Sequence, residues 1–211
     1  AGGTTASQAA SQTNVNYSWP VAPTLGGVSS VTGNAAGGNH GDEYEGPVTL
    51  MNLARWLQPE QVQGRVILLP MLNRPAVAAG TRLSSVDGRN MNRAFYTQYP
   101  EMQVNESITT MIAHYVTQAL IPLADLVIDI HSGGRSIHFL SSVNMHRVPD
   151  ERQMRAMLDA GLAWGAPYVF IYRDVAGEGL LPSYCERLGK VTLGTELGGA
   201  GQFGVETLGI A

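Results

Sequence analysis

LVIDIHSGG, at residues 126–134, is the stretch that decides the predicted fold. Residues 126–131 are apolar except for Asp129 and the terminal His131, a pattern typical of a strand buried within a sheet. The Ser-Gly-Gly that follows lets the chain turn at the carboxyl end of this strand. Residues 65–70 (RVILLP) predict a similar strand, covered on both faces, and residues 191–197 predict a third strand.

The segments between these strands carry helical periodicity. After Pro47, which suits the first position of a helix, apolar residues recur at i, i+3, i+4 and i+7 from Leu50 to Leu57. Further helices are predicted through Ile108, Met111, Ile112, Tyr115 and Ala119, through Met154, Leu158 and Leu162, and near residues 182–188. Strands alternating with helices predict an α/β fold, a mixed and mostly parallel twisted sheet between helices, with ligand sites at the carboxyl ends of strands.

Three segments lack such a pattern. Residues 26–38 have few large apolar side chains, so the strand expected ahead of His40 is predicted to be missing or degraded. Residues 73–100 are rich in Asn, Arg, Gly and Pro, which predicts a long loop of the functional kind. Residues 1–16 are small and polar and predict a flexible tail, which leaves residues 17–211 as one catalytic domain.

Composition and charge exclude several classes of function. The 211 residues carry a net charge of −4 and 13 scattered lysines and arginines, so a nucleic-acid partner is not expected. No apolar run approaches the roughly 20 residues that span a bilayer, so no membrane segment is expected either. Because Cys185 is the only cysteine, no internal disulfide can form. These features predict a cytoplasmic protein and leave a homo-oligomer open.

His40-Gly41-Asp42-Glu43 places an imidazole and a carboxylate three positions apart, so both can reach one ion from a single turn. A catalytic zinc ion usually has three nitrogen or oxygen ligands from the protein and a fourth position for water. His131, at the end of a predicted strand, supplies the third ligand. The sequence therefore predicts one zinc ion on His40, Glu43 and His131.

Two acidic residues in predicted strands are assigned to the same site. Asp129 shares a strand face with His131, and a metal-bound imidazole normally donates its free N–H to a carboxylate. We expect Asp129 to orient a ligating histidine, with a buried cap or salt bridge as the alternative. Glu196, at the carboxyl end of its strand, is predicted to act as general base on water and to return the proton to the leaving amine. A purely structural acid is the alternative for Glu196.

Residues 81–95 (TRLSSVDGRNMNRAF) gather three arginines and two asparagines in the predicted loop. Guanidinium groups bind carboxylates bidentately, so this loop can select a substrate that keeps a free carboxylate. One arginine could polarise the scissile carbonyl, whereas Arg89 is interpreted as a surface residue. His138 and His146 have no acidic partner nearby in the sequence and are interpreted as core or surface residues.

Four segments together resemble the succinylglutamate desuccinylase and aspartoacylase family, relatives of the zinc carboxypeptidases. They are GGNHGDEYEGP at 37–47, RLSSVDGRNMNRAF at 82–95, DIHSGG at 129–134 and GTELGG at 194–199. The resemblance covers the chain from about residue 37 to its end. The first and last segments are most similar to the branch that contains the Nα-acetyl-L-2,4-diaminobutyrate deacetylases of ectoine breakdown.

The resemblance implies the same zinc ligands and the same general base that the residue types predict. It also implies that Asn92 and Arg93 hold the substrate carboxylate and that Arg82 assists at the scissile carbonyl. The spacing from Arg82 to Asn92 is longer than in aspartoacylases. Family members usually continue into a smaller β-rich carboxyl-terminal domain, which is predicted to be absent from this chain.

The features combined predict a zinc-dependent deacylase. Its expected reaction is hydrolysis of the amide of an N-acyl amino acid, of the N-acetyl-diaminobutyrate type, to a carboxylate and a free amine. A metallocarboxypeptidase acting on peptide or cell-wall bonds is the alternative enzyme. A binding module without turnover is the alternative of another class, against which an intact Glu196 argues, since binding alone needs no base.

Overall fold

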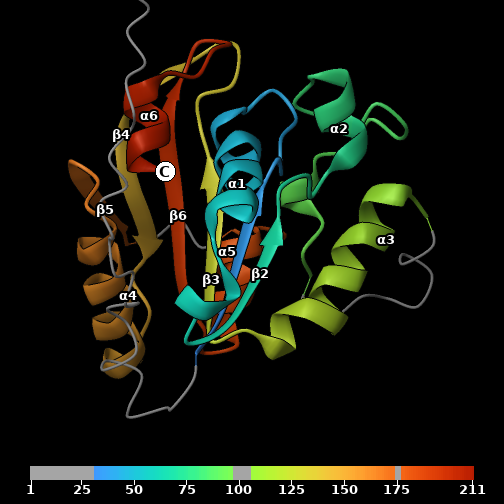
Figure 1. The fold of residues 1–211 in the computed structure, drawn as a ribbon. Helices are drawn as coiled ribbons and strands as arrows, with labels where there is room; N and C mark the ends of the chain where they lie inside the picture. Colours follow the sequence, from blue (N-terminus) through green and yellow to red (C-terminus); the bar gives the residue numbers. More distant parts are fainter. Residues whose placement is uncertain (1–30, 97–105, 174–176) are drawn as a thin grey trace, which may run out of the picture.

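A six-stranded sheet forms the centre of the molecule, with its strands in the order β2-β1-β3-β6-β4-β5 (Figure 1). The structure, a computed structural model, describes residues 31–96, 106–173 and 177–211. The strands are β1 (Val31–Gly37), β2 (Gly64–Leu69), β3 (Leu126–His131), β4 (His138–His146), β5 (Tyr168–Tyr172) and β6 (Val191–Gly199). All neighbours pair in parallel except β4 and β6, so the predicted mixed, mostly parallel sheet is confirmed.

Helices cover both faces of this sheet. The α-helices are α1 (Glu45–Trp56), α2 (Arg74–Ala79), α3 (Ile108–Tyr115), α4 (Glu151–Trp164), α5 (Leu181–Arg187) and α6 (Val205–Ile210). A π-helical segment, η3 (Val116–Leu120), continues α3, and 3-10 turns form at η1 (Pro59–Gln61), η2 (Met91–Arg93) and η4 (Ile121–Leu123). In Figure 1, α1 lies in front of the sheet and α5 behind it. None of the helices in the described ranges has the length and apolar character needed to cross a membrane.

Alternation along β3 sends its side chains to the two faces of the sheet. Leu126, Ile128 and Ile130 belong to the core cluster that includes residues of α1 and α4, whereas Val127 belongs to the cluster that includes residues of α3 and α5. Because successive strand residues point to opposite faces, Asp129 and His131 share the face of Val127. The polar end of β3 therefore faces the side of the sheet on which α5 lies.

The prediction of a missing or degraded strand ahead of His40 is wrong. β1 lies there and pairs in parallel with both β2 and β3. A Cβ atom added at Gly37 would lie 2.6 Å from the carbonyl carbon of Gly46, and one added at Gly46 would lie 2.9 Å from Cα of Gly37. The end of β1 and the start of α1 are thus in backbone contact, which only small residues permit. The small side chains that weakened the strand signal are the ones this packing requires.

Burial also departs from prediction in three elements. β2 is an edge strand and is at most half-buried, rather than covered on both faces. In α4, Leu162 is 62% exposed, and the helix buries a face of Ala156, Met157, Ala160 and Gly161 instead. In α3, Tyr115 is 63% exposed, while Thr109, Thr110 and Ala113 are buried. Large apolar residues guided the prediction, yet apart from Met157 the residues that these two helices bury are small.

The predicted loop at residues 73–100 is only partly a loop. Within its described part, α2 is capped by the Asn73 side chain, which accepts a hydrogen bond from the backbone N–H of Ala76, and is stopped by Gly80 in the left-handed conformation. A helix of six residues is too short to produce visible periodicity. β4 and β5 were not predicted, and the predicted tail at residues 1–16 lies outside the described residues.

Candidate metal centre

The carboxyl ends of β1 and β3 bring the predicted ligands together. The two strands are parallel neighbours, and His131 is the last residue of β3. The chain leaves β1 through a turn that carries His40 and Glu43 just before α1 begins. Gly41 lets this turn pack on α2, since a Cβ atom there would lie 1.9 Å from the carbonyl carbon of Ala76. The turn is therefore fixed among β1, α1 and α2.

Three potential ligands converge at this edge of the sheet. Nδ1 of His40 lies 2.6 Å from Oε1 of Glu43, and Nδ1 of His131 lies 2.7 Å from Oε2 of the same carboxylate. One ligand atom from each of the three residues falls within 4.8 Å of the others, and all three residues are buried. The structure thus brings together the three side chains that the sequence predicts as zinc ligands.

Charge within this cluster keeps its groups ionised despite burial. Burial alone raises the pKa of Glu43, but the charge of His131 and hydrogen bonds from His131 and His40 outweigh it and hold the pKa below its ordinary value. Burial lowers the pKa of His131, yet Asp129 and Glu43 raise it well above its ordinary value. The centre is an ion-pair network in which negative charge favours a bound cation.

The donor set fits a divalent transition metal. Both imidazoles direct Nδ1 toward the Glu43 carboxylate, so two nitrogens and one carboxylate surround a common point. Mixed imidazole and carboxylate ligation with three protein ligands is typical of catalytic zinc sites. The outer nitrogens of both rings are engaged elsewhere, as is usual for metal-binding histidines.

Asp129 and Asn90 make the shortest contacts with those outer nitrogens. Nε2 of His131 lies 2.8 Å from Oδ2 of the fully buried Asp129, which is the residue the sequence singles out for this purpose. Asn39 donates through its amide to the same carboxylate at 3.3 Å. Nε2 of His40 lies 3.0 Å from Oδ1 of Asn90, a contact that the sequence does not reveal.

Glu196 lies beside this cluster on the neighbouring strand. It pairs in register with His131 across β3 and β6, so the two side chains share one face of the sheet. Burial raises its pKa to about 7, with Glu43 and Asp129 adding to the rise while His131 and Arg82 oppose it. Its Oε2 is buried and has no hydrogen-bond partner among the described residues. A carboxyl group with a pKa near neutrality is suited to proton transfer.

The predicted substrate loop folds back over the cluster. Nη1 of Arg82 donates to Oε1 of Glu43 at 3.0 Å, and the arginine side chain is 53% exposed. Oδ1 of Asn92 accepts the backbone N–H of Leu181 at 2.9 Å, which places its Nδ2 3.3 Å from Nε2 of His131. Arg93 donates to the backbone oxygen of Asn92 at 2.6 Å. Arg82 and Asn92 therefore contact the candidate metal ligands, and Arg93 is bonded to the backbone of Asn92.

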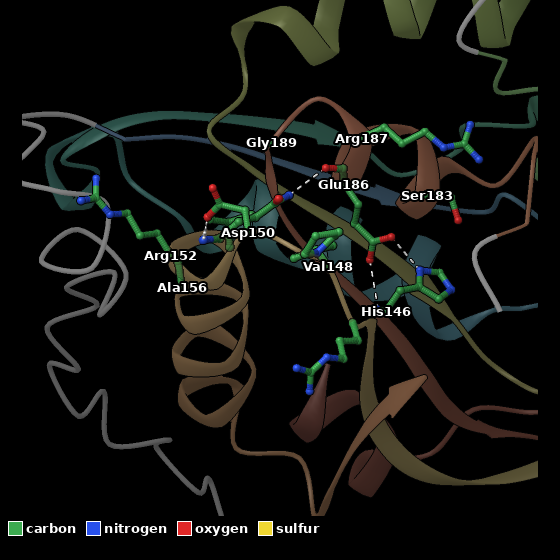
Figure 2. A pocket seen from close by; sticks show the side chains of 13 residues that line it. His146, Val148, Asp150, Arg152, Ala156, Ser183, Glu186, Arg187 and Gly189 are labelled. Atoms are coloured by element: carbon green, nitrogen blue, oxygen red, sulfur yellow. Dashed lines mark hydrogen bonds and ion pairs between the residues drawn. The ribbon is translucent and has the colours of Figure 1, made fainter. Parts of the chain in front are cut away.

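A separate cavity of about 760 Å³ lies at the other end of the sheet (Figure 2). It is lined by His146 at the end of β4 and by Val191 at the start of β6, whereas the metal cluster lies at the carboxyl ends of β1 and β3. His146 bonds through Nδ1 to Oε2 of Glu186 at 2.7 Å, and its backbone N–H donates to Oε1 of the same residue. His146 thus has an acidic partner in α5, forty positions away, which local sequence inspection misses.

A model of the succinylglutamate desuccinylase/aspartoacylase catalytic domain matches residues 35–211. The chain belongs to this family. The family match begins within β1 and spans the three converging ligands together with Glu196. The family resemblance that four short segments carry is therefore confirmed, and it extends over most of the chain.

Individual relatives within the family agree with this assignment. The chain is 44% identical over 174 residues to the N-alpha-acetyl-L-2,4-diaminobutyric acid deacetylase of Halomonas elongata, which covers 82% of this chain and 49% of that protein. Its fold is similar to the succinylglutamate desuccinylase/aspartoacylase of Rhodobacter sphaeroides, at 41% identity and a TM-score of 0.78 over 86% of this chain and 52% of that one.

A further structural relative carries a bound product. The product-bound ectoine utilization protein EutE (DoeB) of Ruegeria pomeroyi is 38% identical, with a TM-score of 0.80, over 87% of this chain and 54% of that one. The chain spans about half the length of each of these relatives.

Proposed function

We propose that this chain provides the catalytic part of a zinc-dependent deacylase that hydrolyses the amide of an N-acyl amino acid. The observation that carries the proposal is the convergence of His40, Glu43 and His131 beside Glu196, whose pKa is near 7. Three ligands and a neighbouring proton carrier are the parts that metal-assisted hydrolysis needs.

Zinc is the metal we assign to this centre. His40 and His131 would bind it through Nδ1 and Glu43 through its carboxylate, since these atoms face one another. Bound zinc supplies a Lewis acid that activates water at neutral pH and polarises a carbonyl group. Asp129 holds the outer nitrogen of His131 and so orients its ring for this purpose.

Glu196 is assigned the proton transfers. It accepts the proton that the attacking water loses as the water oxygen bonds to the acyl carbon. It then delivers that proton to the nitrogen as the carbon–nitrogen bond breaks, which leaves a free amine and a carboxylic acid that ionises to the carboxylate at neutral pH. A pKa of about 7 suits both steps, because the group is readily protonated and readily deprotonated at neutral pH.

The loop at residues 81–95 is assigned to substrate binding. Arg82 reaches Glu43 with a half-exposed guanidinium group, a position from which it can also stabilise negative charge on the acyl oxygen. Arg93 and the Nδ2 group of Asn92 are assigned to the free carboxylate of the amino acid, because a guanidinium group and an amide N–H bind carboxylates well. Nδ2 of Asn92 lies 3.3 Å from Nε2 of His131, and Arg93 donates to the backbone oxygen of Asn92.

The substrate we favour is N-acetyl-2,4-diaminobutyrate, a small N-acyl amino acid. The 44% identical relative is named as a deacetylase of this compound, and a relative of ectoine utilization has a similar fold. These likenesses support a small N-acyl amino acid over the peptide or cell-wall substrate of a metallocarboxypeptidase.

Hydrolysis by the zinc-loaded chain tests the proposal. Release of free amine should be measured from N-acetyl-L-2,4-diaminobutyrate and from a panel of dipeptides, with zinc content determined in parallel. Glu196→Gln should retain zinc and lose about 10²–10⁴-fold in turnover, because the ligands stay intact while the base is removed. The exposed Glu206→Gln is the matched control and should keep wild-type activity.

Two results would contradict the proposal. Cleavage of dipeptides without cleavage of N-acyl amino acids would assign the chain to the peptidases. Stoichiometric zinc without turnover of any N-acyl amino acid would identify a binding module.

A further inference from the structure

Asn90 joins the substrate loop to a candidate metal ligand through one atom. Its Oδ1 accepts the backbone N–H of Asn92 at 2.9 Å and so caps the η2 turn. The same Oδ1 lies 3.0 Å from Nε2 of His40, which is fifty positions away in the sequence.

The backbone contact fixes which way the Asn90 amide points. A backbone N–H can only donate, so the atom that meets Asn92 N–H must be the oxygen of the Asn90 amide and not its nitrogen. An amide oxygen can only accept, so the His40 nitrogen facing it must carry the proton. Two hydrogen bonds thus determine the position of a proton on the imidazole.

That proton position makes the other ring nitrogen, Nδ1, the atom through which His40 can bind a metal. A neutral imidazole protonated at Nε2 has its lone pair on Nδ1. Nδ1 of His40 is the atom that faces Glu43, at 2.6 Å, within the cluster of three potential ligands. Without a metal ion this nitrogen donates a proton to the Glu43 carboxylate, and a bound metal ion would take the place of that proton. The opposite tautomer would turn a hydrogen toward the metal position and the lone pair toward an oxygen that has no proton to give.

The two candidate histidine ligands are held by chemically different partners. Asp129, a carboxylate, accepts from Nε2 of His131, whereas Asn90, a neutral amide, accepts from Nε2 of His40. A carboxylate increases the basicity of the imidazole more than an amide does. A carboxylate in place of the Asn90 amide should therefore strengthen zinc binding by His40.

We propose that Asn90 is a positioning residue that holds His40 in the tautomer presenting Nδ1 to the metal, with its own orientation set by the Asn92 backbone. The inference rests on the proposed function only in that the cluster binds zinc. It makes the η2 turn, which carries Arg93, part of the support of the metal centre.

Zinc affinity of the metal-free chain tests this inference without any measurement of catalysis. Asn90→Ala should raise the zinc dissociation constant about 10–100-fold, the usual effect of losing a partner that orients a ligating histidine. Asn90→Asp keeps an acceptor for both N–H groups, so its zinc dissociation constant should equal or fall below the wild-type value. A chelator competition titration measures all three proteins.

A control in the same loop separates positioning from loop stability. Asp87 ties this loop to α3 by accepting the backbone N–H and the hydroxyl of Thr109, at 2.8 and 2.9 Å, and within the described ranges none of its hydrogen bonds reaches a candidate ligand. Asp87→Ala should lower the thermal midpoint and leave zinc affinity within about threefold, as expected for loss of a helix cap. In the zinc-loaded wild type, ¹⁵N spectra of His40 should show a protonated Nε2 and a metal-bound Nδ1.

Each outcome decides the matter. If Asn90→Ala binds zinc as the wild type does, or if Asn90→Asp weakens zinc as much as Asn90→Ala, the positioning assignment is wrong while the deacylase proposal stands. Equal weakening by Asp87→Ala would reduce the effect to loop stability and also overturn it. A wild-type chain that takes up no zinc would overturn this inference and the proposed function together.

Discussion

Glu43 is the residue through which the whole centre is connected. Its two oxygens contact Nδ1 of both histidines, and the first of them also accepts from Arg82. A buried carboxylate remains ionised only when cations or donors surround it, and this one is surrounded on both sides. A bound metal ion would replace histidine charge as the partner of this carboxylate.

The raised pKa of Glu196 predicts a pH-dependent stability in the metal-free chain. Burial raises the pKa from 4.5 to about 7, so the folded protein holds this proton more tightly than the unfolded chain does between those values. The free energy of unfolding contributed by this group therefore falls as pH rises from 4.5 to about 7 and stays lower above that. Glu196→Gln removes this loss in the free energy of unfolding, because glutamine cannot ionise.

Urea denaturation with a chelator present measures the effect. Glu196→Gln should match the wild type near pH 4 and exceed its stability at about pH 8 by on the order of 1–3 kcal/mol. Glu206→Gln, a change at an exposed glutamate, should show no such pH-dependent difference. A constant gap between Glu196→Gln and the wild type at both pH values would contradict the explanation.

The sequence predicts the potential metal ligands better than it predicts the residues that orient them. His40, Glu43 and His131 could be predicted because their residue types and strand-end positions carry the signal. Asp129 could be predicted because it lies two residues from His131 on one strand face. Asn90 could not, since its contact with His40 spans fifty residues and depends on how the loop folds back.

Among the elements, β1 and α1 depend most on small residues. Gly37 and Gly46 let the strand and the helix touch through their backbones, and the turn between these two elements carries His40 and Glu43. Sequence patterns predicted α1 from its apolar spacing but missed β1, because a strand of Gly and Ala lacks the large side chains on which strand prediction depends. β4 and β5 were missed as well, and much of their surface is exposed.

Gly37→Ala should disturb both stability and metal binding. The added methyl group would lie 2.6 Å from the Gly46 carbonyl carbon, so α1 must move away from β1. We expect a loss of about 1–3 kcal/mol in the free energy of unfolding, the usual cost of overpacking, together with weaker zinc binding. Denaturation and chelator competition measure the two effects.

Gly209→Ala is the matched control for this substitution. Gly209 lies in α6, and a methyl group there meets nothing within 4 Å. Alanine favours helix over glycine by about 0.5–1 kcal/mol, so this variant should be neutral or slightly more stable. If Gly37→Ala is as stable as Gly209→Ala, the backbone contact between Gly37 and Gly46 does not restrict the size of residue 37.

Across the whole molecule, the sheet separates two buried polar groups of residues. The candidate metal ligands lie at the carboxyl ends of β1 and β3, and the pair of His146 and Glu186 lies at the amino end of β6 (Figure 2). The α/β class and the mostly parallel pairing could be predicted, because alternating strands and helices allow few topologies. The antiparallel insertion of β4 beside β6 has no local sequence signal, so the second polar group could not be placed.

Glu186→Ala should therefore destabilise the fold without affecting the metal centre. The change leaves His146 and its backbone N–H without their acceptor in a buried position, where such a loss costs about 2–4 kcal/mol. Zinc affinity should stay within about threefold of the wild type. A large loss of zinc affinity in a variant that still folds would show that the two ends are coupled.

The pairing of β3 with β6 aligns His131 with Glu196, and Thr195 secures this alignment by bonding through its hydroxyl to the backbone N–H and carbonyl of His131 at 3.2 Å each. Sliding β6 by a single position would swing the glutamate to the opposite side of the sheet, among the apolar side chains near α4. Assembly of the chemistry and formation of the sheet are thus one event. A chain that pairs these strands correctly has already set Glu196, the proposed proton carrier, in place, and the proposed chemistry would fail in a chain that pairs them in another register.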